Sequence, residues 1–231
     1  METSDIRLKA SDGREFAAYY VCGNEPSAPG VVLAQEIFGI NSFVRDAAQR
    51  VAAAGFDVIA PDLFWRQEPG LQLSPDREAD REKAMNLMKG LDQAEAVEDL
   101  SNAAAFLRAQ RPDRRVGIVG YCLGGKFAFL LAARGLVDAA VSYYGVAIQN
   151  ALSEAANFDV PLLLHIAEED HLCPAEARDQ IVDALQPRGA EVMIYPGAGH
   201  GFARTRSPAY VAEAASRANA ATDAFLARHL A

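Results

Sequence analysis

The stretch that decides the fold is "RRVGIVGYCLGGKFAFLLA", residues 114–132. Its first apolar run, residues 116–119, has the length of a buried strand, and the second, residues 127–133, has the composition of a buried helix. The few residues between them form the pattern G-x-C-x-G, with Cys122 at its centre. A nucleophile at the apex of a sharp strand-to-helix turn has this pattern, usually with serine in the middle. The stretch therefore predicts a strand, a tight turn at Cys122 and a helix.

Outward from this stretch, apolar strand patterns alternate with helical patterns. The repeated order predicts an α/β fold, with a mostly parallel central sheet covered by helices on both faces. Residues 65–77 form the longest polar connection, which we interpret as a surface loop or lid. The expected strands are 6–8, 17–21, 30–34, 57–60, 116–119, 139–143, 161–166 and 191–194, and the expected helices are 42–55, 91–107, 127–133 and 208–230.

Length and composition limit the possible classes of protein. A chain of 231 residues that is 51% hydrophobic and 23% charged predicts one globular domain over residues 1–231. The net charge of −9, without a basic block, argues against nucleic acid or an anionic membrane as partner. No leader pattern or membrane-length apolar run is found, so a cytoplasmic location is expected. Three unpaired-looking cysteines predict neither a disulfide framework nor a zinc site.

Ligands of parallel sheets bind beyond the carboxyl ends of the strands, so residues that follow the strands are the candidates for chemistry. Cys122 follows one strand, and His200 lies in the glycine-rich loop "PGAGHGF" after the last one. Three acids compete in "AEEDHLCP", of which Asp170 is preferred over Glu168 and Glu169 because the chain turns toward a helix after it. The order nucleophile, acid, histidine is that of an α/β-hydrolase triad.

The other histidines and cysteines are interpreted as structural. His165 lies inside an apolar strand and His229 in the terminal helix, while His171 is expected to point away from the site. Cys22 and Cys173 have no glycine frame and are also interpreted as structural.

Glu36 directly follows an inner strand in "AQEIFGIN". An unpaired carboxylate there would be costly to bury, and two interpretations are open. It is paired with an arginine, or it faces the thiol of Cys122.

The motifs "AQEIFGIN", "APDLFWR", "GIVGYCLGGK", "YYGV" and "GAGHGF" occur in order along nearly the whole chain. With them the chain resembles the dienelactone hydrolase (carboxymethylenebutenolidase) family, single-domain α/β-hydrolases with a cysteine nucleophile. The resemblance implies a triad of Cys122, Asp170 and His200, with Glu36 contacting the resting thiol. It also implies further site residues: an oxyanion hole from the backbone N–H groups of Ile37 and Leu123, substrate-carboxylate binding by Arg81 and Arg204, and Tyr144 as a pocket residue.

The chain departs from the family pattern at Met85 and Met88, where aromatic residues are usual, and methionine reshapes a pocket easily. The predicted activity is cysteine-dependent hydrolysis of an activated ester or enol lactone, dienelactone to maleylacetate. A small anionic lactone or ester is the expected partner, without cofactor or metal, and the chain is expected to be a monomer. The alternatives are an esterase or thioesterase for another acyl group, and a non-catalytic member that binds a small anion.

Overall fold

The computed structural model describes residues 1–231 except 24, 26, 112 and 158. Across the described residues the strands form an eight-stranded sheet in the order β1-β2-β4-β3-β5-β6-β7-β8. By internal contacts the chain divides into two compact units, Met1–Gly117 and Ile118–Ala231, which we describe in turn.

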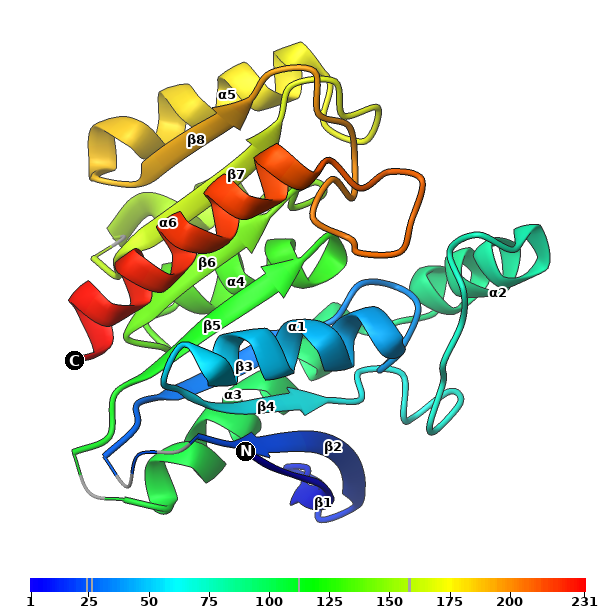
Figure 1. The fold of residues 1–231 in the computed structure, drawn as a ribbon, viewed down its shortest axis with the longest axis vertical. Coiled ribbons are helices and arrows are strands. Elements are labelled where there is room, and N and C mark those ends of the chain that lie inside the picture. Colours follow the sequence, from blue (N-terminus) through cyan, green and yellow to red (C-terminus); the bar gives the residue numbers. More distant parts are fainter. Residues whose placement is uncertain (24, 26, 112, 158) are drawn as a thin grey trace. The chain divides into compact units, whose positions relative to one another are not determined.

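The first unit begins with an antiparallel hairpin, and its inner strands are covered by helices on both faces. β2 pairs antiparallel with β1 and with β4, and β3 pairs parallel with β4. Figure 1 shows α1 in front of β3 and β4, with α3 behind them. The elements are β1 (Glu2–Lys9), β2 (Glu15–Cys22), β3 (Gly30–Ala34), α1 (Ser42–Ala53), β4 (Asp57–Pro61), α2 (Glu78–Lys89) and α3 (Gln93–Ala109).

The second unit continues the parallel pattern with a helix for each crossover. β6 pairs parallel with β7, and β7 with β8. Figure 1 shows α6 on one face of these strands and α4 on the other. The elements are β5 (Val116–Tyr121, which begins in the first unit), α4 (Leu123–Ala133), β6 (Ala139–Tyr143), η1 (Ile148–Asn157), β7 (Leu162–Ala167), α5 (Ala175–Leu185), η2 (Gln186–Arg188), β8 (Glu191–Tyr195) and α6 (Ala212–Leu230).

The mostly parallel sheet with helices on both faces confirms the predicted fold class. The inner strands β3, β4, β5, β6 and β7 are buried along their whole length, as expected for strands covered on both sides. The Asn41 side chain caps α1 by accepting from the Val44 N–H at 3.2 Å, so this helix begins where the sequence predicts.

Two helices differ from the prediction. α2 occupies residues 78–89, just after the predicted connection 65–77, where no helix was predicted, and only Ala84 of this helix is buried. α6 begins at Ala212 and not at residue 208 as predicted, and Val211 is its exposed N-cap.

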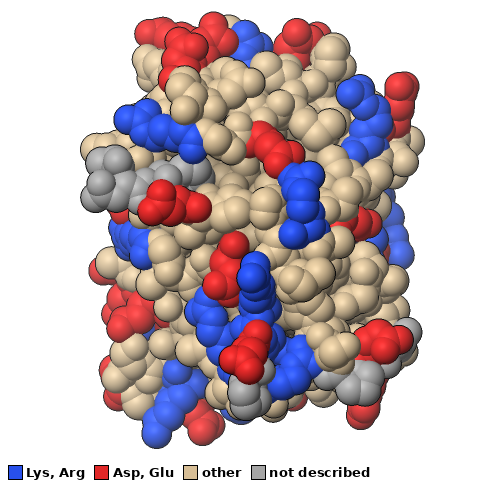
Figure 2. Space-filling view, turned by 90° about the vertical axis from the view of Figure 1, so that its left-hand side faces the viewer, with Lys and Arg blue, Asp and Glu red and all other residues tan. Residues whose placement is uncertain are grey.

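Acidic and basic side chains are spread over the face of the molecule drawn in Figure 2. On the face drawn in Figure 2, red and blue residues lie intermixed among uncharged ones. Within the described residues, no helix is long and apolar enough to cross a membrane.

Candidate active site

The turn after β5 holds Cys122 in an unusual backbone conformation. Its φ is 56° and its ψ is −113°, values that a non-glycine residue adopts only where the surroundings enforce them. The Cys122 N–H donates to the Tyr143 carbonyl at 3.0 Å, and the Cys122 carbonyl accepts from the Val146 N–H at 3.2 Å. These bonds to the end of β6 fix the thiol at the start of α4.

The glycines of the G-x-C-x-G pattern allow this turn to be so tight. A Cβ on Gly120 would lie 1.9 Å from the Gly124 carbonyl oxygen. A Cβ on Gly125, the residue after the pattern, would lie 2.8 Å from the Gly145 Cα. Glycine at positions 120 and 125 is therefore required for α4 to pack directly against the strand ends.

Asp170 and His200 meet at the loops that follow β7 and β8. The His200 Nδ1 and the Asp170 Oδ2 are 2.8 Å apart, and Asp170 is 3% exposed. The second carboxylate oxygen accepts from the Leu172 N–H at 2.8 Å, which fixes the orientation of the carboxylate. Of the competing acids, Glu168 instead accepts from the Gly197 N–H, and both it and Glu169 are exposed.

The imidazole of His200 is hydrogen-bonded on its other side to Cys122. Burial of the ring would lower its pKa, but attraction to the negative charge of Cys122 and the hydrogen bonds to Asp170 and Cys122 raise the pKa of His200 to about 10. The arrangement thus favours the imidazolium form of His200, oriented by a buried carboxylate.

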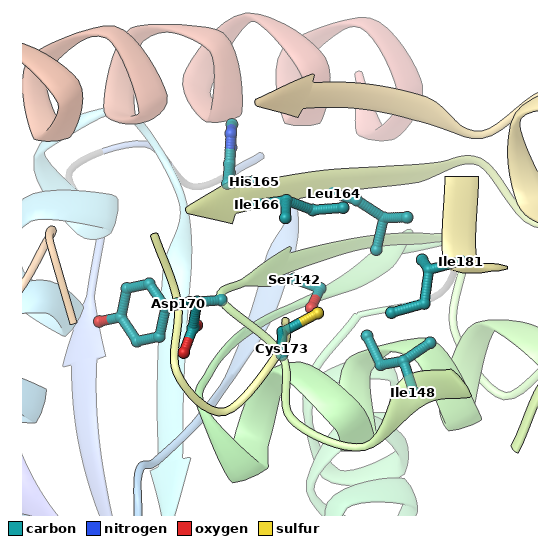
Figure 3. A pocket seen from close by; sticks show the side chains of 10 residues that line it. Ser142, Ile148, Leu164, His165, Ile166, Asp170, Cys173 and Ile181 are labelled. Carbon is teal, nitrogen blue, oxygen red and sulfur yellow. The ribbon is translucent and has the colours of Figure 1, made fainter. Parts of the chain in front are cut away.

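Cys173 lies on the same turn as Asp170, in a different environment. Figure 3 shows its sulfur directed into a small cavity beneath this turn, lined by Ser142, Ile148, Leu164 and Ile181. Burial and the nearby charge of Asp170 raise the pKa of the Cys173 thiol to about 11. This thiol is therefore protonated at neutral pH, in accord with its interpretation as structural.

Tyr144 and Arg204 lie beside the same histidine. The rings of Tyr144 and His200 are 5.1 Å apart and nearly perpendicular. Tyr144 has a φ of 39° and donates its N–H to the His165 carbonyl at 2.8 Å. Arg204 is 8% exposed, and its guanidinium lies so close to Gly201 that a Cβ there would be 3.0 Å from it.

The predicted side-chain direction of His171, next to Asp170, was wrong. Its ring was expected to point away, yet its centroid lies 6.0 Å from that of His200, at 76° between the ring planes. The turn that aims the Asp170 carboxylate also aims the next side chain at the same imidazole. The adjacent DH pair was the available signal, but the side-chain direction depends on turn torsions that the sequence does not specify.

The remaining predicted site residues belong to the first unit. Glu36 and Ile37 directly follow β3 and are buried, with 1% and 8% exposure. Arg81 lies on α2, is exposed, and donates to the Pro75 carbonyl at 2.9 Å. Met85 and Met88 lie on the same helix, the first exposed and the second half-buried. Their roles, and that of the Leu123 N–H in the first turn of α4, stay predictions.

The connection between β4 and α2 is anchored within the first unit. The Leu73 N–H donates to the Phe38 carbonyl at 2.9 Å, and the Asn41 amide donates to the Leu73 carbonyl at 3.1 Å. Gly39 packs so closely here that a Cβ would lie 1.8 Å from the Leu71 carbonyl oxygen. Residues 71–73 are therefore held against the segment after β3, which restricts any lid movement to other parts of the connection.

The motif "APDLFWR" has a structural role in the same unit. Trp65 Nε1 donates to the buried Asp99 carboxylate at 2.9 Å, and the Arg66 guanidinium pairs with the same carboxylate. The motif therefore ties the end of β4 to α3. Among the described residues, no group of three His, Cys, Asp or Glu side chains could hold a metal ion.

The strand order, with a sharp strand-to-helix turn after β5, defines the class of protein as an α/β-hydrolase. The model of the dienelactone hydrolase family matches residues 16–230. The chain is 41% identical to carboxymethylenebutenolidase of Pseudomonas putida, covering 98% of this chain and 97% of that protein. It is 38% identical to carboxymethylenebutenolidase 1 of Cupriavidus pinatubonensis strain JMP 134, with 98% and 97% covered. The chain belongs to the dienelactone hydrolase family.

Solved structures agree on the fold. A dienelactone hydrolase from Anabaena variabilis has a TM-score of 0.73 at 20% identity, covering 100% of this chain and 99% of that one. The dienelactone hydrolase-like promiscuous phosphotriesterase P91, from metagenomic libraries, has a TM-score of 0.79 at 21% identity, with 100% of both chains covered.

Proposed function

We propose that this chain is a cysteine-dependent hydrolase of activated carboxylic esters and enol lactones, with dienelactone as its substrate and maleylacetate as its product. One observation carries the proposal: His200 is hydrogen-bonded to Cys122 on one side and to the buried Asp170 on the other. This order of groups is what a thiol nucleophile requires for activation and for later proton transfer.

In the first half of the reaction the Cys122 thiolate attacks the carbonyl carbon of the lactone. The electron pair of the carbonyl moves to oxygen, and backbone N–H groups near the start of α4, including that of Leu123, donate to this oxyanion. Collapse of the intermediate breaks the C–O bond to the enolate and leaves a thioester on Cys122. The imidazolium of His200 supplies a proton to the released enol oxygen.

In the second half water hydrolyses the thioester. Once Cys122 is acylated it has no negative charge, so a main cause of the raised pKa of His200 is gone and the imidazole becomes neutral more easily. Neutral His200 takes a proton from water as the water oxygen attacks the thioester carbonyl. The C–S bond then breaks, and the thiolate–imidazolium pair is restored.

The nucleophile favours substrates with good leaving groups. A thiol has a pKa of about 8.5, whereas the alcohol that is the conjugate acid of an alkoxide has a pKa near that of water, about 15.7. The tetrahedral intermediate of a simple alkyl ester therefore expels sulfur and returns to substrate. An enolate leaves more readily, which supports an enol lactone, an aryl ester or a thioester as substrate.

The family and the relatives named carboxymethylenebutenolidase support hydrolysis of an ester or lactone bond. The largely buried Arg204, close to His200 along the chain, supports a substrate with a carboxylate, and Arg81 is the second proposed partner of that group. Met85 and Met88 on α2 favour a second candidate, a hydrolase of the same mechanism for another acyl group. The three cysteines, free of disulfides, support a reducing compartment such as the cytoplasm.

The test is hydrolysis of cis- and trans-dienelactone, followed by ultraviolet absorbance beside p-nitrophenyl acetate. Wild type, Cys122→Ala and Cys173→Ala are compared, because the last variant removes a thiol of the same unit that the mechanism does not use. We expect fast lactone hydrolysis in wild type, nearly unchanged rates in Cys173→Ala, and a loss of at least about 10³-fold in Cys122→Ala.

The outcomes separate the candidates. Turnover of the aryl ester alone, still dependent on Cys122, would support the mechanism and indicate that the substrate carries another acyl group. Ligand binding without turnover of either compound by wild type would overturn the proposal and favour a small-anion-binding protein.

A further inference from the structure

The second imidazole beside His200 is not used by the mechanism above. The rings of His171 and His200 have centroids 6.0 Å apart and are nearly perpendicular. His171 is exposed, whereas the side chain of His200 is 9% exposed. Since both rings belong to the second unit, a titratable group open to solvent flanks the buried candidate base.

The position of His171 is fixed by the turn that orients Asp170. The Leu172 N–H donates to the Asp170 carboxylate at 2.8 Å, and the Cys173 N–H donates to the Asp170 carbonyl at 3.1 Å. Cys173 is buried, which anchors the end of the turn. The backbone of His171 therefore cannot move far from His200 without disturbing the carboxylate that His200 contacts.

We propose that His171 is a positioning residue that acts through His200. A positive charge on His171 makes protonation of His200 less favourable, so that His200 stays neutral down to a lower pH in the acyl-enzyme. This inference rests on the proposed function for its kinetic part only. Histidine is the side chain that most readily gains or loses a positive charge near neutral pH. Two cations at this separation repel each other, so protonation of one ring opposes protonation of the other.

Other charged groups of the second unit act on the same pair. Asp170 and Cys122 contact His200 directly and favour its protonated form. The Arg204 guanidinium lies close to Gly201, the neighbour of His200 along the chain, and is a further positive charge in this region. Glu168 and Glu169 precede Asp170 on the loop and are exposed. Comparing variants that differ only at position 171, with Cys122 replaced or acylated, separates the effect of His171 from that of these groups.

The expected size follows from Coulomb's law. Two unit charges 6 Å apart, near a protein surface with an effective dielectric constant between about 40 and 80, shift a titration midpoint by about 0.5 to 1 pH unit. Because the coupling is reciprocal, His200 shifts the titration of His171 by the same amount.

The direct test is NMR titration of the two imidazoles in the full chain with Cys122→Ala, so that no thiolate contributes. In this background His171→Phe keeps a ring beside His200 without charge, and His171→Lys places a permanent charge there. We expect the His200 midpoint to be about 0.5 to 1 unit lower in the Lys variant than in the Phe variant. In the reverse experiment, His200→Gln is expected to raise the midpoint of His171 if His200 is protonated first. Equal His200 midpoints in the Lys and Phe variants, together with an unchanged His171 midpoint in His200→Gln, would overturn the proposal.

The kinetic test measures deacylation of the enzyme acylated by p-nitrophenyl acetate, in variants that retain Cys122. The acid limb of the deacylation rate is expected to lie about 0.5 to 1 pH unit lower in His171→Lys than in His171→Phe. A common acid limb would contradict the inference. If no acyl-enzyme forms at all, the proposed function fails while the NMR titration still decides the coupling.

Discussion

At the scale of single residues, the two buried thiols of the second unit differ through their neighbours. Cys122 has the imidazole of His200 as hydrogen-bond partner, whereas Cys173 faces a small, largely apolar cavity beside the Asp170 carboxylate. A neighbouring imidazolium favours a thiolate, and burial beside a carboxylate disfavours one. We therefore predict that the same functional group is reactive at position 122 and inert at position 173.

This difference predicts selective alkylation. With a pKa of about 11, Cys173 is thiolate in roughly one molecule in a few thousand at pH 7.5. We expect iodoacetamide to modify Cys122 at least about 100-fold faster than Cys173, as followed by peptide mass spectrometry. His200→Gln should slow the reaction of Cys122 by removing its hydrogen-bond partner. Comparable rates at both cysteines would contradict the assignment of different roles.

Side-chain positions could be predicted from the sequence only where chain order and chemistry agree. Asp170 was selected from three adjacent acids by its place before the turn, and it is the acid that contacts His200. His171 was placed wrongly because neighbouring residues of a loop can point to the same or to opposite sides, according to torsions that no periodic pattern specifies.

At the scale of elements, hydrophobic periodicity predicts what is packed and misses what is exposed. The buried inner strands and the amphipathic helices α1 and α3 lie close to their predicted ranges. Helix α2 has one buried residue, Ala84, so its sequence lacks the apolar repeat by which helices are found. Its content of Glu, Ala, Lys and Met favours a helix by propensity alone.

The close crossing of β5 and α4 predicts a severe effect of one methyl group. In Gly120→Ala the added Cβ would lie 1.9 Å from the Gly124 carbonyl oxygen, a backbone atom that cannot move away alone. We expect the free energy of unfolding to fall by about 3 kcal/mol or more, measured by urea denaturation. Gly199→Ala is the matched control, because its Cβ would find its nearest contact at 3.8 Å. An equal loss in both variants would contradict this steric argument.

The packing of α6 on β6, β7 and β8 depends on a buried polar chain centred on His165. This residue is fully buried, with its ring nitrogens 2.9 Å from the Tyr195 hydroxyl and 2.9 Å from the Thr222 hydroxyl of α6. His165→Phe would leave both hydroxyls without this partner. We expect it to lower the free energy of unfolding by about 2 to 3 kcal/mol.

A double-mutant cycle checks this cost. Tyr195→Phe in the His165→Phe background removes one of the two hydroxyls that lose the imidazole, whereas the Thr222 hydroxyl keeps the Tyr143 hydroxyl at 2.7 Å, so the double variant should lose less stability than the sum of the single ones. Strict additivity in urea unfolding would indicate that the two side chains are not coupled.

At the scale of the whole molecule, the fold follows from the sequence more directly than the site does. Alternation of apolar strands with helical patterns leaves few arrangements other than a mostly parallel, two-sided sheet, because crossover connections are short and have one hand. The site instead depends on loops after separate strands, and their side chains converge only once the sheet is formed. Sequence order identifies those loops, whereas the contacts of His200 with Asp170, Cys122 and His171 require the folded chain.

The protonation of His200 couples the site to the stability of the molecule. Burial would lower the pKa of His200, but Cys122 and Asp170 raise it to about 10, whereas an imidazole in the unfolded chain titrates near 6.5. The folded state therefore keeps a proton that the unfolded state loses. The stabilisation that results is fully present below about pH 6.5 and is lost as the pH rises through about 10. The thiol of Cys122 adds a second effect if it is a thiolate in the folded site, because an unfolded thiol keeps its proton up to about pH 8.5. Below that pH the proton on the unfolded thiol balances the proton on the folded His200, so the loss of stability is confined to higher pH.

We therefore expect the free energy of unfolding to fall most steeply between about pH 8.5 and 10, by about 2 kcal/mol, in urea denaturation series of the wild type. Cys122→Ala removes the thiolate that raises the pKa of His200, so its stability should change much less over the same range. A parallel fall in both proteins would assign the loss to other groups and would contradict a thiolate–imidazolium pair in the folded site. A fall confined to the wild type would instead tie the stability of the molecule to the same charge pair that the proposed mechanism uses, because both depend on the proton held between Cys122 and His200.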